Sequence, residues 1–224
     1  MRYSPVLTSL DLPVAELSAL RLDGEAFALD EAVIAVDEPE LAVNRAAALA
    51  GLFTPRMVVE LDTALWVYGC LSRPPAVHTG SIRRDTRGRL LSTTRLTLRE
   101  TTVPEEEIVS LAGIRITTRG RTAVDVALLD AVPPERGAAV RELCGSAQVA
   151  AEALTIALQL GHTPGKLRAI DRLREWSVGR PPDPATATPR RVRRVAQHWP
   201  LSGDSPVGCR ADNADRAALD RGAG

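Results

Sequence analysis

The sequence predicts an α+β protein, with a helix and a hairpin ahead of a small mixed sheet packed with helices. Residues 13–22 show the spacing of apolar residues that is typical of an amphipathic helix, and three short stretches between residues 76 and 117 read as strands. From Thr122 to Trp176 the helical period returns in several segments divided by Gly or Pro. Beyond residue 176 the chain is rich in Pro, Gly, Arg and Asp, which predicts a disordered tail.

The front segment predicts one helix followed by a hairpin. In PVAELSALRL, Pro13 suits the first helical turn, and the residues expected to share one face are Val14, Leu17, Leu20 and Leu22. Asp23-Gly24 ends this helix. The stretch EAFALDEAVIAVDEP then predicts a small hairpin that turns at Asp30-Glu31.

Two more helices are expected before the sheet. Pro39 opens the first, PELAVNRAAALAGLF. Thr54-Pro55 has the form of a cap followed by a first-turn proline, so RMVVELDTALWVYGCL is expected to be helical from its start.

Three stretches predict the strands of the small sheet: AVHTGS at 76–81, RLTLRE at 95–100 and IVSLAGIRIT at 108–117, the last divided at Ala112-Gly113. The helices expected after the one that begins at Thr122 lie in AVPPERGAAVRELCG, AQVAAEALTIALQLG and TPGKLRAIDRLREW.

The bulk composition predicts a cytoplasmic protein. No apolar run among the 224 residues approaches the roughly 18–20 residues that span a bilayer, and the N-terminus lacks the features of a signal peptide. Cys70, Cys144 and Cys209 are odd in number and far apart, so they predict neither a disulfide framework nor a zinc site.

The zero net charge hides an acidic front, residues 1–62, and a basic back, residues 161–194. That asymmetry is compatible with separate partner-binding and nucleic-acid-binding faces, or with two solvated faces of one domain.

The motifs of the common enzyme classes are missing, so we expect a protein without catalytic residues, cofactor or metal. The only lysine, Lys166, does not follow an acidic residue by two positions, and no P-loop, GxGxxG or HExxH is present. Gly80-Ser81 and Gly145-Ser146 are not followed by the acid pair that holds magnesium in nucleotidyltransferases. An uncharacterised enzyme stays an alternative hypothesis, with His78, Asp125 or Cys144 as its reactive groups.

The stretch GIRITTRGRTAVDVALLD, residues 113–130, reads as a strand that leads into a helix. Thr117 or Thr118 is expected to cap that helix, which disfavours phosphate binding at its start because no glycine-rich loop precedes it. Arg121 and Asp125 are four residues apart and able to pair. The residues expected to be buried are Val124, Ala127 and Leu128. The candidates for partner binding are Arg119, Arg121 and Asp125.

Arginines also gather in two other places, which supports a DNA-binding regulator as an alternative. Such residues bind phosphates in a salt-dependent manner, although an exposed loop that only aids solubility has the same composition. The nucleic-acid-binding candidates are Arg83, Arg84, Arg87, Arg89, Arg191, Arg193 and Arg194.

Several of these pieces together resemble the AbiEi-type antitoxins of type IV toxin–antitoxin systems, in their short actinobacterial branch. The matching pieces are Ala64-Leu65-Trp66-Val67-Tyr68-Gly69, Val77-His78-Thr79, Leu96-Thr97-Leu98-Arg99, Gly113 through Ala127, and Pro164 through Ala169. The front stretch LSALRLDGEAFALDEAVIAVDEP resembles the end of a recognition helix followed by a wing hairpin. The resemblance covers about residues 14–174, and G-I-R-I-T-T-x-x-R-T-A-V-D is its most specific part.

The resemblance implies a transcriptional regulator that neutralises a nucleotidyltransferase toxin by protein–protein binding and represses its own operon. It also implies a DNA-binding winged helix in front, but only about 12 residues precede the first helix and the segment is acidic. We therefore expect residues 1–38 to be a winged-helix remnant, 39–175 an antitoxin-like α+β domain, and 176–224 a disordered tail. The expected partners are the toxin and operator DNA, with no membrane and no small-molecule substrate.

Overall fold

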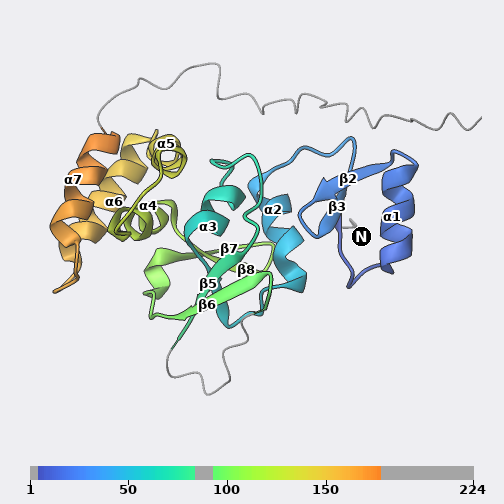
Figure 1. Cartoon of the computed structure of the whole chain (residues 1–224), viewed down its shortest axis with the longest axis horizontal. Coiled ribbons are helices and arrows are strands. Elements are labelled where there is room, and N and C mark those ends of the chain that lie inside the picture. Colours follow the sequence, from blue (N-terminus) through green and yellow to red (C-terminus); the bar gives the residue numbers. More distant parts are fainter. Residues whose placement is uncertain (1–4, 84–92, 178–224) are drawn as a thin grey trace, which may run out of the picture. The chain divides into compact units, whose positions relative to one another are not determined.

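The computed structural model describes residues 5–83 and 93–177 (Figure 1). Within these ranges the chain forms seven α-helices, a three-stranded sheet and a five-stranded sheet, which confirms the predicted α+β class. All of these elements belong to one compact unit, Met1–Pro189.

The small sheet contains the predicted hairpin and one strand that the sequence did not indicate. Strands β2 (Ala26–Leu29) and β3 (Ala32–Ala35) are antiparallel, and the turn between them places Asp30 at a φ of 57°. Strand β1 (Val6–Leu7) pairs with the other edge of β3, which gives the order β1-β3-β2. A two-residue strand has too short a pattern to be seen as an alternation of apolar and polar residues.

Helix α1 (Val14–Leu22) forms where it was expected, but its apolar face is mostly exposed. Leu17 is buried against Ala26 and Val33, whereas Val14 is 69% and Leu22 is 87% exposed. Of the four residues expected to share one face, only Leu17 is fully buried, and Leu20 is partly buried beside it. The small sheet therefore covers only the middle of α1, where Leu17 and Leu20 pack against Ala26 and Val33.

The large sheet is mixed, in the order β6-β5-β4-β8-β7. Pairs β4–β8 and β5–β6 are parallel, and pairs β4–β5 and β7–β8 are antiparallel. The strands are β4 (Met57–Val59), β5 (His78–Ile82), β6 (Leu96–Glu100), β7 (Ile108–Leu111) and β8 (Ile114–Thr117). Between β6 and β7, a short 3₁₀ turn spans Glu105–Glu107.

The central strand β4 corrects the prediction of a helix starting at residue 54. Met57, Val58 and Val59 are all buried, because a central strand is covered on both faces. A short apolar run of this kind fits either a strand or a buried helix, and Thr54-Pro55 favoured the wrong one. Helix α3 (Leu61–Val67) begins only after Glu60, and Gly69, whose φ is 87°, follows its C-cap residue Tyr68.

Both sheets share one hydrophobic core with α2 (Ala42–Ala48), its 3₁₀ extension Leu49–Gly51, and α3. Val6 and Ile34 of the small sheet are buried in the same cluster as Trp66 of α3 and Ile116 of β8. The predicted boundary at residues 38 and 39 therefore does not separate two cores.

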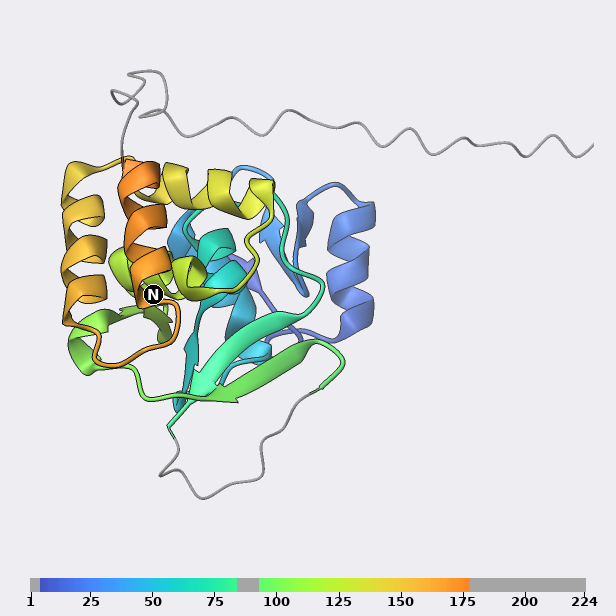
Figure 2. The same ribbon diagram turned by 60° about the vertical axis from the view of Figure 1, so that its left-hand side comes forward.

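The remaining helices form a second core beside the sheet, where α4 contacts α5, α6 and α7 (Figure 2). Their bounds are α4 (Arg119–Leu128), α5 (Pro134–Leu143), α6 (Ala147–Gln159) and α7 (Lys166–Ser177). The tail beyond Ser177 lies outside the described residues. Across the two described ranges, none of the helices has the length and apolar character that crossing a membrane requires.

The turn between β7 and β8 offers a test of the strand register. Ala112 and Gly113 have φ values of 50° and 80°, which is the left-handed pair that a two-residue hairpin turn requires. Ala112 is strained in this region, whereas Asn adopts it readily. We expect Ala112→Asn to raise the free energy of unfolding by roughly 0.5–1 kcal/mol, measured by urea denaturation. A loss of stability would show that the turn has another conformation.

Candidate functional site

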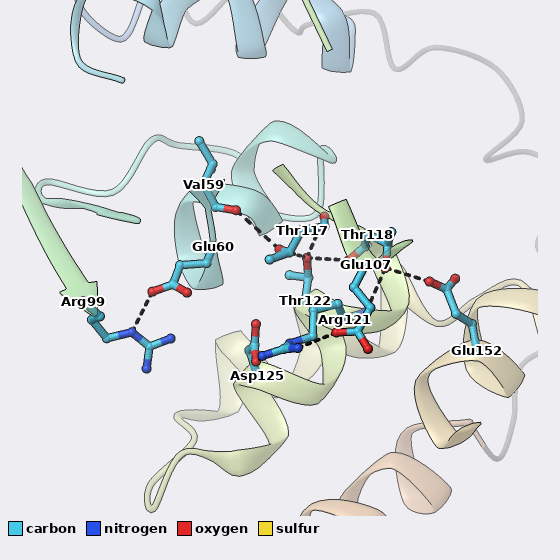
Figure 3. A network of polar contacts seen from close by, with 10 residues as sticks. All are labelled: Val59, Glu60, Arg99, Glu107, Thr117, Thr118, Arg121, Thr122, Asp125 and Glu152. Carbon is cyan, nitrogen blue, oxygen red and sulfur yellow. Dashed lines mark hydrogen bonds and ion pairs between the residues drawn. The ribbon is translucent and has the colours of Figure 1, made fainter. Parts of the chain in front are cut away.

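The start of α4 is the best-organised part of the stretch Gly113–Asp130. The side chain of Thr118 accepts a hydrogen bond from the backbone N–H of Arg121 at 3.2 Å, which makes Thr118 the cap. Thr117 faces the interior, where its hydroxyl lies 2.7 Å from that of Thr122 (Figure 3). Of the two threonines proposed as the cap, the structure therefore selects Thr118.

A carboxylate of the chain itself lies at the start of α4. Thr118 Oγ1 donates to Glu152 Oε1 of α6 at 2.7 Å (Figure 3). A Cβ atom at Gly120 would lie 2.6 Å from Cδ of Glu152, so the glycine makes room for this side chain. Anions favour helix N-termini, and the carboxylate of Glu152 lies at this one. The sequence did not indicate Glu152; the only signal was the small residue Gly120.

Arg121 is buried between two acidic side chains. Its Nε donates to Asp125 Oδ1 at 2.8 Å, and its Nη1 bonds to Glu107 Oε2. The predicted pairing of Arg121 with Asp125 is confirmed. All of Gly120–Ala127 is buried, which is more than the predicted stripe, and Leu128 is only partly covered.

A second ion pair lies beside this one. Arg99 Nε donates to Glu60 Oε1 at 2.6 Å, and the Glu60 side chain is only 1% exposed. Glu60 Oε2 and Asp125 Oδ2 are both buried without a hydrogen-bond partner within the described part of the chain. Glu60, Arg99 and Glu107 come from three separate segments, so sequence patterns alone do not group them with Arg121.

Burial makes Asp125 hard to ionise. Its loss of solvent raises the pKa to about 6, against the opposing charge and hydrogen bond of Arg121, while the neighbouring Glu60 raises it further. Between about pH 4 and pH 6 the folded protein therefore holds a proton that the unfolded chain, with a pKa near 3.8, has released. The stability that this proton contributes is fully present below about pH 4 and is lost as the pH rises through 6.

We expect Asp125→Asn to remove this pH dependence. Between pH 4 and pH 7 the free energy of unfolding of the wild type should fall relative to that of the variant, by up to about 3 kcal/mol. Urea denaturation of both proteins at several pH values measures the difference. Parallel pH profiles would contradict the raised pKa of Asp125.

Arg119 differs from Arg121 in its exposure to solvent and in its ion pairs. It is exposed, its guanidinium lies 4.7 Å from the centre of the Tyr68 ring, and no ion pair holds it within the described ranges. Tyr68 is fixed below it because its hydroxyl donates to Thr117 O at 2.6 Å. Of the three partner-binding candidates, only Arg119 therefore presents its charge to solvent.

Arg119 also lines an open groove of about 410 Å³. The groove lies beside the edge strand β7, which contributes Val109 and Leu111, and reaches α2 and α6. The complete lining consists of Ala42, Tyr68, Val109, Leu111, Thr118, Arg119, Val149 and Glu152. The apolar lining of this groove, together with the exposed guanidinium of Arg119, is suited to a partner segment that is apolar and carries an anion.

Most of the nucleic-acid-binding candidates lie outside the described residues. Arg83 is exposed at the end of β5, whereas the others cannot be placed: Arg84, Arg87, Arg89, Arg191, Arg193 and Arg194.

The tip of the wing-like hairpin is held by the large sheet. Asp30 accepts from Arg95 and lies 2.8 Å from Nε2 of His78, and Glu31 accepts from Arg95. Burial alone would raise the pKa of Asp30, but His78 and Arg95 together hold it below its usual value. The hairpin tip is thus engaged within the molecule.

The three residues of the enzyme hypothesis have different neighbours. His78 is fully buried between Phe53 and Trp66 and is bonded to Asp30. Asp125 is bonded to Arg121. Cys144 is buried in the helical core, and burial raises its pKa to about 11, so its thiol stays protonated at neutral pH. Within the described residues, no group of three or more His, Cys, Asp or Glu side chains is placed to hold a metal ion.

Comparison with known proteins adds no family assignment. No protein-family model matches the chain, and no curated protein matches it either.

Proposed function

We propose that this protein is an antitoxin-like binding protein that neutralises a nucleotidyltransferase-type toxin by direct contact, through the groove beside Arg119. The observation that carries the proposal is the exposed guanidinium of Arg119, stacked on Tyr68 at the edge of an apolar groove. An arginine in such a setting is a common anchor of protein–protein interfaces. The resemblance to AbiEi-type antitoxins supplies the class of partner.

Two features support binding at Arg119 over the other charged residues of the joint. Arg121 and Asp125 bond to each other and have side chains only 10% and 6% exposed, so they are shielded from a partner. Arg119 has no charge partner within the described ranges, and its position over Tyr68 restricts the side chain before binding. An ordered arginine loses less conformational entropy when a partner binds.

Co-expression with the product of the adjacent gene tests this proposal, and a neighbourhood without a nucleotidyltransferase gene would count against it. The wild-type protein should restore the growth of cells that produce the toxin and should co-purify with it at a fixed ratio. Rescue without co-purification would favour an indirect mechanism. If the protein neither restores growth nor co-purifies with the toxin, the proposed function is ruled out.

Repression of its own operon is a separate part of the proposal, and a DNA-binding regulator without a toxin partner is its alternative. Arginines are suited to phosphate contacts, and the hairpin tip is occupied by His78 and Arg95. If arginines contact phosphates, binding to upstream DNA should weaken steeply as salt increases. The measurement is an electrophoretic mobility shift of upstream DNA at several salt concentrations. A mobility shift that does not change with salt, or the absence of any shift, would leave no support for DNA binding through these arginines.

A further inference from the structure

The edge strand β7 lacks the usual protection of a sheet edge. Its sequence, IVSL, contains no charged residue and no proline, and β8 is its only neighbouring strand within the described ranges. Val109 is 37% exposed, and Ser110 is exposed as well. Edges of this kind pair readily with another strand unless a charge, a proline or a covering segment prevents it.

The register of β7 against β8 identifies the groups that such a strand would meet. Ile108 is paired with Thr117, and Glu107 O accepts from Thr118 N at 2.8 Å. Hydrogen bonds in an antiparallel pair fall on alternate residues, so those to β8 involve residues 107, 109 and 111. The backbone N–H and C=O of Ile108 and Ser110 therefore point away from β8 and are available to a new strand.

The surroundings of this edge select the charge of the new strand. Glu105 is paired with Arg115, and Glu107 with Arg121, so these neighbouring acids are already neutralised. The carboxylate of Glu152 accepts from Thr118. That bond comes from a neutral hydroxyl, so the groove holds the carboxylate of Glu152 as well as the guanidinium of Arg119. Arg119 is the exposed one of the two and has no ion pair within the described ranges, so an acidic side chain of the partner would complement it.

We propose that an extended segment of the protein partner adds to the outer edge of β7, with apolar side chains in the groove and an Asp or Glu on Arg119. This inference rests on the proposed function and specifies how the partner is recognised. In such strand addition the backbone hydrogen bonds provide affinity, and the alternate side chains provide specificity. A second copy of this chain is the competing occupant, because its own β7 edge carries the same outward-pointing backbone groups.

The variant Ser110→Pro tests strand addition directly. Proline removes an N–H that points away from β8, and an edge strand tolerates it, so the fold should be retained. Binding of the whole 224-residue chain to the proposed toxin partner should weaken by about tenfold or more. Ser110→Thr, which keeps the N–H, should bind within about threefold of the wild type. Wild-type affinity in Ser110→Pro, with an unchanged melting temperature, would overturn strand addition but not the proposed function.

A second experiment decides the inference if the nucleotidyltransferase does not bind at all. Random octapeptides displayed on phage are selected against the full-length protein. We expect a consensus that contains Asp or Glu with Val, Ile or Leu at alternate positions, and its binding should be lost in both Ser110→Pro and Arg119→Glu. No consensus, or one insensitive to these variants, would overturn the inference. A dimer of the wild type that Ser110→Pro dissociates in sedimentation would also overturn it, by making a second copy the occupant.

Discussion

Arg121→Ala is expected to lower the free energy of unfolding by about 3–5 kcal/mol, the usual cost of removing one partner from a buried ion pair. The alanine would leave Glu107 and Asp125 without their cation, although their side chains are only 15% and 6% exposed. Glu60 lies close enough to Asp125 to add repulsion. Urea denaturation at pH 7 measures the loss.

Two controls separate this buried pair from ordinary surface charge. Arg119→Ala, two residues earlier, should change the stability by less than about 1 kcal/mol, because an exposed arginine forms no buried pair. The loss in Arg121→Ala should also become smaller toward pH 5, since Asp125 with a pKa of about 6 then takes up a proton. Equal effects of the two alanine variants would contradict the buried position of Arg121.

Arg119→Glu is expected to have the opposite profile, with a large effect on binding and a small one on folding. Reversing this charge places two anions against each other at the proposed contact. We expect the dissociation constant for the toxin to rise by about 30-fold or more, the size of a typical anchor residue at an interface. Arg119→Lys should show an intermediate loss, because lysine keeps the charge but not the planar group that stacks on Tyr68.

The local sequence was enough to predict the strand-to-helix joint. Ile114 and Ile116 alternate with polar residues, and a threonine before the helix provides the cap, as the structure confirms. The hairpin at Asp30 and the pairing of Arg121 with Asp125 were predicted for the same reason, since each depends on residues close together in the chain.

Other features depend on contacts between distant segments, and the sequence could not reveal them. Met57–Val59 becomes a strand because β5 and β8 flank it on both sides, although the same residues also fit a helix. Arg119 and Arg121 are two positions apart on a helix, so they point in nearly opposite directions. Only the positions of Glu107 and Tyr68 decide which of the two is buried.

The most direct test of the account is the affinity of Arg119→Glu for the proposed toxin partner, measured by isothermal titration calorimetry. Arg56→Glu, which reverses an exposed charge just before β4, serves as the matched control. We predict that Arg119→Glu loses about 30-fold or more in affinity, while Arg56→Glu and the melting temperatures of both variants stay near the wild-type values. Equal affinities of Arg119→Glu and the wild type would contradict a partner site at Arg119.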